Sequence, residues 1–166
     1  MSIASGTRRD FLTGRHLNTR RLPLPPGATD TTIKDCTGCG DCLDACPEKI
    51  IVFQSGVPAV DFNLGECTFC GLCADRCPER VFPPDNPRQF YHHAVIGDDC
   101  LAVNFVDCQS CREICPTTAI RFLPRIGGPF LPHLDTETCS GCGACVSVCP
   151  NGCISMHDRT REVEHA

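Results

Sequence analysis

The fold is decided by residues 36–47, which read Cys-Thr-Gly-Cys-Gly-Asp-Cys-Leu-Asp-Ala-Cys-Pro. Four cysteines stand here at the spacing C-x2-C-x2-C-x3-C, and a proline follows the last of them. This is the spacing at which bacterial sequences present thiolates to a [4Fe–4S] cluster. The first three cysteines can wrap one part of a cube-shaped cluster as a tight loop, and the glycines between them let the backbone come close to it.

The run occurs three more times and uses all but one of the 17 cysteines in the 166-residue chain. Two copies keep the spacing, and the third in chain order has seven residues instead of two after its first cysteine. We therefore predict that iron–sulfur clusters, more than a large apolar core, hold this small chain together. The four runs are Cys36, Cys39, Cys42, Cys46; Cys67, Cys70, Cys73, Cys77; Cys100, Cys108, Cys111, Cys115; and Cys139, Cys142, Cys145, Cys149.

The runs are expected to work in pairs, because in two-cluster ferredoxins the fourth cysteine of a run ligates the other cluster. We predict four [4Fe–4S] clusters, each held by three cysteines of one run and the fourth cysteine of its partner run. The ligand sets are Cys36, Cys39, Cys42 and Cys77 (set 1); Cys67, Cys70, Cys73 and Cys46 (set 2); Cys100, Cys108, Cys111 and Cys149 (set 3); and Cys139, Cys142, Cys145 and Cys115 (set 4).

Disulfides and zinc fit this cysteine-rich chain less well than iron–sulfur clusters do. A disulfide scaffold is typical of secreted domains and does not require this repeated spacing. A zinc site also uses C-x2-C, but it needs neither a third cysteine at the same spacing nor a proline after each fourth cysteine. The sequence therefore favours iron over zinc and over disulfides.

Some residues stand apart from the regular pattern. The loop of residues 101–107 must bring Cys100 back to set 3, where the neighbouring aspartates are poor competitors for iron–sulfur ligation. Cys153 has no set of its own and is expected to be a small buried hydrophobe. The six histidines lack metal-binding spacing. His92 and His93 are expected in one strand, with one side chain inside and the other outside.

The runs group into two similar halves. We expect an α+β fold of two fused bacterial 2[4Fe–4S] ferredoxin-like units, with short strands, short helices and an extended N-terminal arm. The expected parts are 1–32 for the arm and a proline-rich linker without a packed core, 33–95 and 96–157 for the units, and 158–166 for a polar end. Proline after each fourth cysteine should stop a short helix there. Strands are expected at 50–53, 58–62, 81–82, 119–122, 131–134 and 154–156.

Charge is distributed unevenly along the chain. Residues 1–21 carry five Arg and one Asp, a net of +4, so the −5 of the whole chain leaves −9 for the rest. An acidic body argues against nucleic acid as a partner, and the basic arm suggests a separate partner. The longest apolar runs, such as 50–53, are far shorter than the roughly 20 residues of a membrane span.

The arm resembles a twin-arginine export signal at residues 7–13. An export signal continues with an apolar stretch of about 7–15 residues. Residues 14–21 are instead polar and basic. We therefore expect the protein to reside in the reducing cytoplasm.

Three features together resemble the NapF-type ferredoxins, which are encoded with the periplasmic nitrate reductase. They are the stretched third run, the segment Arg8-Arg9-x-Phe11-Leu12-Thr13-Gly14-Arg15, and Cys108-Gln109-Ser110-Cys111-Arg112-Glu113-x-Cys115-Pro116. The resemblance covers nearly the whole chain. It implies a cytoplasmic protein with four [4Fe–4S] clusters that contacts the molybdenum-containing catalytic subunit of the nitrate reductase before export and helps its maturation.

The expected function is therefore electron transfer without catalysis, since the sequence has no nucleotide, flavin or nucleophile motif. An accessory maturation factor would dock on the precursor of the catalytic subunit through Arg8, Arg9, Phe11 and Leu12. The alternative is an electron-transfer subunit of another redox complex, such as a quinol dehydrogenase. The arm favours the first, because a simple relay needs only an exposed cluster.

Overall fold

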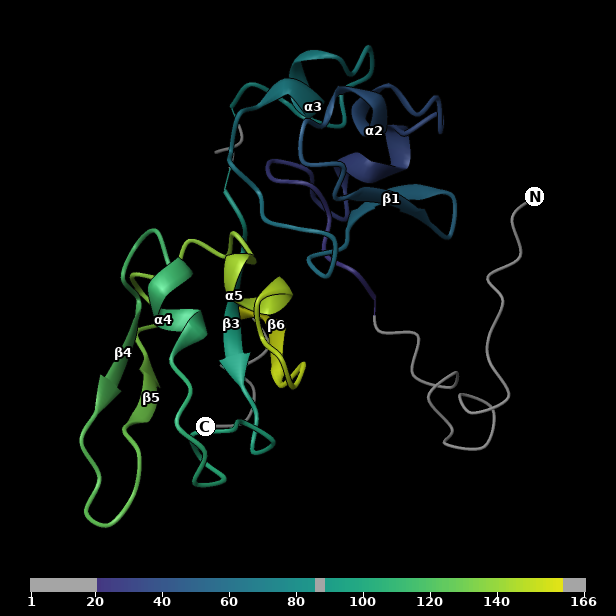
Figure 1. Cartoon of the computed structure of the whole chain (residues 1–166). Coiled ribbons are helices and arrows are strands. Elements are labelled where there is room, and N and C mark those ends of the chain that lie inside the picture. Colours follow the sequence, from purple (N-terminus) through teal and green to yellow (C-terminus); the bar gives the residue numbers. More distant parts are fainter. Residues whose placement is uncertain (1–20, 86–88, 160–166) are drawn as a thin grey trace, which may run out of the picture.

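The computed structural model describes residues 21–85 and 89–159 as a set of short helices and strands around the cysteine runs (Figure 1). The expected docking residues Arg8, Arg9, Phe11 and Leu12, like residues 160–166 of the polar end, lie outside the described residues. The elements, in chain order, are η2 (Thr32–Asp35), α2 (Asp41–Ala45), β1 (Ile51–Gln54), β2 (Val57–Val60), α3 (Leu72–Asp75), β3 (His92–Ile96), α4 (Ser110–Ile114), β4 (Ile120–Leu123), β5 (Leu131–Leu134), α5 (Ala144–Ser147) and β6 (Ile154–Asp158).

Each pair of cysteine runs is separated by a β-hairpin. β1 pairs antiparallel with β2, with Ile51 opposite Val60, and β4 pairs antiparallel with β5, with Ile120 opposite Leu134. The third sheet joins β3 to β6, which lie before and after the second pair of runs. In Figure 1, β1, α2 and α3 form one part of the molecule, and β3 to β6 form the other with α4 and α5.

Every cysteine run contains one short helix. Three of the helices begin after a left-handed glycine, such as Gly40 with φ 92° before α2. The fourth, α4, follows Gln109 instead. α2 and α4 end immediately before the fourth cysteine of their runs, where the proline that follows disfavours a further helical residue. The expected short helices are therefore present.

The buried apolar residues surround the cysteines. Ile50, Val60 and Phe62 pack with Cys42, Cys46 and Cys73 in the first part, and Ile120, Phe122 and Ile154 pack with Cys100, Cys111 and Cys145 in the second. The third cysteine of each run lies on its helix and is buried. The buried cysteines thus belong to the same apolar clusters as the strand residues.

The proline-rich stretch was expected to lack a packed core, and that prediction is wrong. Pro25 is fully buried. Leu24 packs against the cluster of Ala28, Ile33 and Val81. The Val60 amide donates to the Pro23 carbonyl at 2.8 Å. Prolines lack the amide donor but keep an acceptor and an apolar ring, so an extended proline-rich chain can pair with a strand edge and bury its rings.

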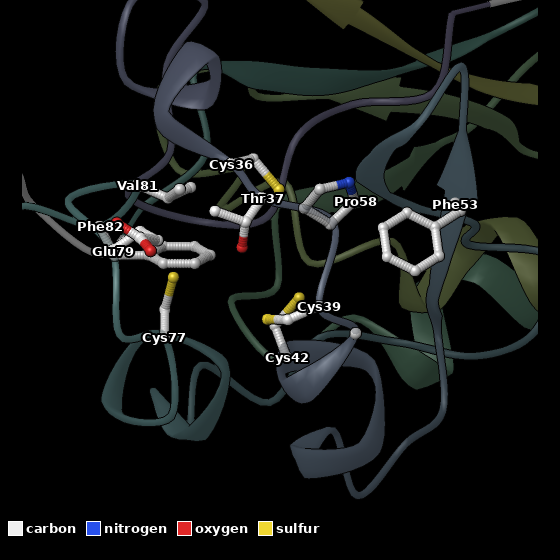
Figure 2. A pocket seen from close by; sticks show the side chains of 11 residues that line it. Cys36, Thr37, Cys39, Cys42, Phe53, Pro58, Cys77, Glu79, Val81 and Phe82 are labelled. Atoms are coloured by element: carbon white, nitrogen blue, oxygen red, sulfur yellow. The ribbon is translucent and has the colours of Figure 1, made fainter.

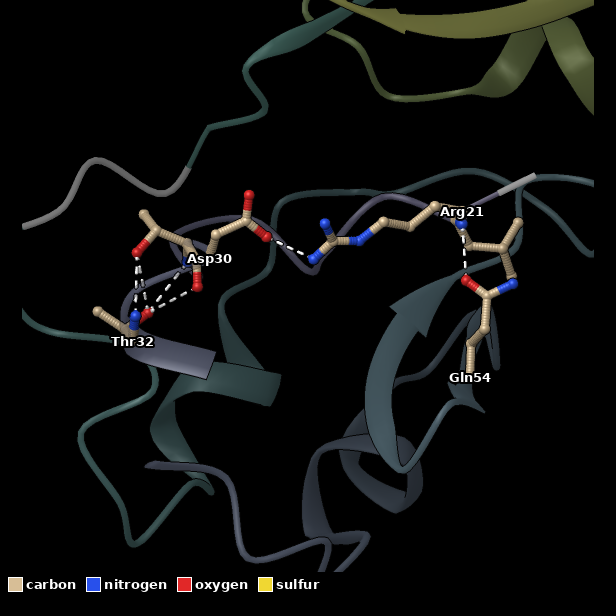
Figure 3. A network of polar contacts seen from close by, with 6 residues as sticks. Arg21, Asp30, Thr32 and Gln54 are labelled. Carbon is tan, nitrogen blue, oxygen red and sulfur yellow. Dashed lines mark hydrogen bonds and ion pairs between the residues drawn. The ribbon is translucent and has the colours of Figure 1, made fainter. Parts of the chain in front are cut away.

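Polar contacts hold this stretch at its two ends (Figure 3). The Leu22 amide donates to the Gln54 side-chain oxygen at 2.8 Å, and Arg21 forms an ion pair with Asp30. Thr29 and Thr32 form a local network at the start of η2, in which the Thr29 amide donates to the Thr32 hydroxyl at 3.0 Å. Residues 21–32 therefore belong to the folded body.

Three further expectations need correction. Residues 81–82 form a turn and a bend rather than a strand, with Val81 buried. β3 pairs with β6 along its whole length, so the expected boundary after residue 95 would cut through a strand that belongs with the second part.

His92 and His93 are both buried, at 3% and 2% exposure, because β3 is covered on both sides at this end. The strand expected at 131–134 is present as β5.

Among the described residues, no helix combines the length and the apolar character that crossing a membrane requires.

Candidate metal centres

The four cysteines of set 1 surround one cavity (Figure 2). Its empty volume, including open solvent, is about 330 Å³. Cys36, Cys39 and Cys42 come from the first run and Cys77 from the end of the second, and Figure 2 shows their sulfur atoms facing a shared space. Apolar side chains complete the lining, among them Phe53, Pro58, Val81 and Phe82. The fold thus brings the partner run's fourth cysteine to this site.

Set 4 has the same arrangement in the second part of the molecule. Cys139, Cys142 and Cys145 line a cavity together with Cys115, the fourth cysteine of the preceding run, and its empty volume, again including open solvent, is about 300 Å³. Ala94, Ile120 and Met156 provide apolar walls. Both cavities are therefore ringed by the thiols that the crosswise assignment groups together.

Electrostatic interactions identify the neighbours in sets 2 and 3. Burial raises the pKa of Cys67 to about 11, and the other three thiols of set 2 add to this rise. Burial likewise raises the pKa of Cys111 to about 11, with contributions from the other three thiols of set 3. Cys67 therefore lies near the other three thiols of set 2, and Cys111 lies near those of set 3. Such interactions also reach across neighbouring sets, as from Cys73 of set 2 to Cys42 of set 1.

The raised pKa values have a chemical consequence. Burial raises the pKa of Cys42 to about 11 and that of Cys145 to about 12, so these groups are protonated thiols at neutral pH in the absence of metal. Metal ligation requires the thiolate, and loading of these sites must therefore release protons.

The donors fit an iron–sulfur cluster. Four sulfur atoms that face a common volume from separate directions suit a cube with an iron atom at each of four corners. Backbone N–H groups point at sulfur, as that of Phe69 does at Cys67 and that of Ala74 at Cys73, and such donors stabilise an anionic cluster with its thiolates. Within residues 21–85 and 89–159, no three His, Cys, Asp or Glu side chains lie close enough together to hold a single metal ion.

The stretched third run returns Cys100 to set 3 through an ordered loop. The Asn104 amide donates to the Cys100 carbonyl at 3.0 Å, and its side-chain nitrogen donates to the Asp98 carbonyl at 2.7 Å. Arg125, which follows β4, donates to the Ala102 carbonyl at 3.0 Å, and its guanidinium lies 4.1 Å from the centre of the Phe105 ring. Neither Asn104 nor Arg125 was predicted from the sequence, although an Asn in the middle of the long gap was visible there.

Cys153 differs from the expected buried hydrophobe. Its side chain is half-buried, and its sulfur lies 3.4 Å from the sulfur of Cys149 in set 3. All 17 cysteines fall within the described residues, and all are free thiols. Cys153 is thus a fifth thiol beside set 3.

His92 supports the loop of set 4, which comprises residues 139–143 before α5. Burial lowers the pKa of His92, so its ring is neutral, and Nε2–H donates to the Gly141 carbonyl at 2.9 Å. Gly141 lies between Cys139 and Cys142 and has φ 76°, a conformation that favours glycine. The buried His92 side chain therefore binds the backbone of this loop.

Comparison with known proteins agrees with this geometry. Residues 35–81 match the 4Fe-4S dicluster domain family, and residues 106–160 match the LdpA Fe-S cluster-binding domain family. A curated relative, the Ferredoxin-type protein NapF of Haemophilus influenzae, is 37% identical over 95% of this chain and 97% of its own length. The Ferredoxin-type protein NapF of Escherichia coli (strain K12) is 38% identical over 90% of this chain and 93% of its own length.

A more distant relative is a subunit of an ion-translocating oxidoreductase complex from Methanosarcina acetivorans, which is 37% identical over 73% of this chain and 46% of its own length. The two NapF relatives, in contrast, match across nearly the whole of both chains. The chain therefore belongs to the family of NapF ferredoxin-type proteins.

Proposed function

We propose that this ferredoxin-type iron–sulfur protein carries electrons on four [4Fe–4S] clusters, one at each of sets 1 to 4, in two fused two-cluster units. The observation that carries the proposal is the pair of cavities, each surrounded by three thiols of one run and the fourth thiol of its partner run. The group supplies reversible one-electron chemistry when bound, and the chain tunes its potential by burial and N–H···S hydrogen bonds. In this proposal the protein catalyses no reaction of its own.

Metal analysis tests the cluster content. Protein purified without oxygen is expected to contain about 16 iron and about 16 acid-labile sulfide per chain, since each cluster holds four of each. A preparation that reproducibly contains zinc and little iron would overturn the proposal. Air-exposed protein serves as the comparison, because exposed clusters lose iron to oxygen and the loss should track a fall in visible absorption.

The proposed partner is the cytoplasmic precursor of the molybdenum-containing catalytic subunit of the periplasmic nitrate reductase. Support comes from the family resemblance and from the charge of the arm, +4 over residues 1–21. Arg21, the last arginine of the arm, pairs with Asp30 on the body. The next residue, Leu22, is held to the first hairpin by the hydrogen bond from its amide to Gln54. None of the seventeen cysteines forms a disulfide in the structure, which suits the reducing cytoplasm, where such docking would occur.

Deletion of residues 1–20 is expected to weaken binding to the nitrate reductase precursor by more than tenfold and to leave the iron content unchanged. Four arginines are lost, and exposed ion pairs contribute roughly 0.5 kcal/mol each, about 2 kcal/mol in total. Titration calorimetry at low and high salt measures the loss, which should shrink as salt screens the intact arm.

Replacement of the exposed body residue Arg80 by Ala is the matched control and should leave binding unchanged. Equal affinity with and without the arm would exclude the arm as the docking element. Capture of a membrane quinol dehydrogenase in place of the precursor would favour the alternative function.

A further inference from the structure

The two parts of the molecule meet between set 2 and set 4. The Cys67 amide donates to the Cys142 carbonyl at 2.8 Å. Cys67 is the first cysteine of the second run and belongs to set 2, whereas Cys142 is the second cysteine of the fourth run and belongs to set 4. One hydrogen bond therefore connects the backbone of a cysteine at one candidate centre to that of a cysteine at another.

A series of ring contacts follows the same route. Phe69, which lies between Cys67 and Cys70, packs edge-on against Phe90 with ring centres 5.5 Å apart. The Phe90 ring lies 4.5 Å from that of His92, centre to centre. His92 then donates from Nε2 to the Gly141 carbonyl inside the loop of set 4. Contacts thus run without interruption from the loop of set 2 to the loop of set 4.

This junction is closely packed and buried. Phe62, Phe90 and His92 are 4%, 7% and 3% exposed. Glycine at position 143 lets the loop of set 4 lie on Phe62, since a Cβ there would overlap the Phe62 ring. A close-packed contact has low compressibility and therefore keeps the two candidate centres at a fixed separation.

Within each part, the two sets lie side by side. α2 packs against α3, and α4 packs against α5 (Figure 1). The buried third cysteines of the four runs lie on these helices, Cys42 and Cys73 on the first pair and Cys111 and Cys145 on the second. Set 1 therefore neighbours set 2, and set 3 neighbours set 4.

We propose that electrons pass between the two parts of the protein at the junction of set 2 and set 4, so that the four sets operate in the order 1, 2, 4, 3. This inference rests on the proposed function. An electron given up at set 2 is accepted at set 4, with no bond broken and no proton transferred. Tunnelling falls steeply with distance, and the hydrogen bond from Cys67 to Cys142 provides a short bonded path between the two sites.

Two variants of the full chain test the order, and each of them lacks two of the four sets. The first retains sets 2 and 4, and the second retains sets 1 and 3. Each should contain about half of the iron of the unsubstituted protein. The substitutions are Cys36→Ala, Cys39→Ala, Cys100→Ala and Cys108→Ala in the first variant, and Cys67→Ala, Cys70→Ala, Cys139→Ala and Cys142→Ala in the second.

Electron paramagnetic resonance of the fully reduced variants shows which sets are neighbours, because two unpaired spins split each other's signals only when they are close. The variant with sets 2 and 4 is expected to have split or broadened signals, and the variant with sets 1 and 3 to have simple, unsplit ones. Splitting in the second variant, or its absence in the first with both clusters present, would overturn the proposal.

Variants that lack only one set test the same order with three clusters in place. Removal of set 2 alone should leave set 1 as an isolated, unsplit signal, whereas removal of set 1 alone should leave all three remaining signals coupled. The same pattern in both variants would refute the order. Iron content separates a failure of the order from a failure of the proposed function. Too little iron in the unsubstituted protein refutes the proposed function, and correct iron with the wrong coupling refutes only the order.

Discussion

Cys77→Ala is expected to empty set 1, whose other three cysteines lie in the preceding run, and to leave set 2 occupied. Cys77 lines the same cavity as Cys36, Cys39 and Cys42, so its loss leaves three thiols around that space. Set 2 keeps all of its members, because its fourth thiol comes from Cys46. The iron content should fall by a quarter, from about 16 to about 12 per chain.

Alkylation of free thiols under anaerobic, native conditions, followed by peptide mass spectrometry, locates the loss. Label should appear on Cys36, Cys39 and Cys42, and the cysteines of set 2 should stay protected. The reciprocal variant Cys46→Ala should invert the pattern and expose Cys67, Cys70 and Cys73. Labelling that follows the run containing the substitution, rather than its partner run, would refute crosswise ligation.

Cys153→Ala is the matched control for these variants. It also removes a thiol, and that thiol lies 3.4 Å from Cys149, but it belongs to none of the four sets. All four sets are therefore expected to stay occupied and protected. The first part of the molecule should melt earlier in Cys77→Ala than in this control, because the binding energy of a structural metal site is folding energy.

The cysteine spacing carried most of the information about the candidate centres. Ligands within one run are close in sequence, so a local pattern fixes which three face a common point. The fourth member could be assigned only from the paired-run rule, and the cavities of set 1 and set 4 have those thiols in their walls. Strands were predictable where short apolar segments lie between turns, as at 131–134.

Features that depend on tertiary packing were not predictable in the same way. The proline-rich stretch has the composition of a linker, because nothing local indicates that Pro23 accepts a hydrogen bond from Val60 or that Pro25 is buried. His92 and His93 were expected to alternate between inside and outside, as successive residues of a strand do. Both are buried because the second face of β3 is covered by residues distant in sequence. The junction of set 2 with set 4 joins residues 67 and 142 and leaves no periodic signal in the sequence.

Gly143→Ala is the second substitution with a large expected effect, because an alanine here would both strain the backbone and overlap a neighbouring side chain. Its φ of 82° lies in the left-handed region, and a Cβ would overlap Cδ1 of Phe62. Phe62 is 4% exposed and packs edge-on against Phe90 and His92, so it cannot move without disturbing that group. Gly143→Ala should therefore incur about 1–2 kcal/mol of backbone strain and about 1–3 kcal/mol of overpacking.

Gly127→Ala separates the two costs. Gly127 has a similar φ of 74°, but nothing lies within 4 Å of the position that a Cβ would take, so only the backbone strain should remain. At roughly 3 °C per kcal/mol for a chain of this size, the melting temperature should fall by about 10 °C in Gly143→Ala and by about 4 °C in Gly127→Ala. Anaerobic thermal denaturation measures both, with iron release recorded in parallel.

A double-mutant cycle assigns the additional loss to its contact. Phe62→Leu in the Gly143→Ala background relieves the overlap, so the double variant should be more stable than the sum of the two single losses predicts. Additive losses, or equal melting temperatures for the two alanine variants, would mean that Phe62 moves aside without cost. In that case the contact of Gly143 with Phe62 would not hold the loop of set 4 against the first part of the molecule. The hydrogen bond from Cys67 to Cys142 and the ring contact of Phe69 with Phe90 would remain to hold it.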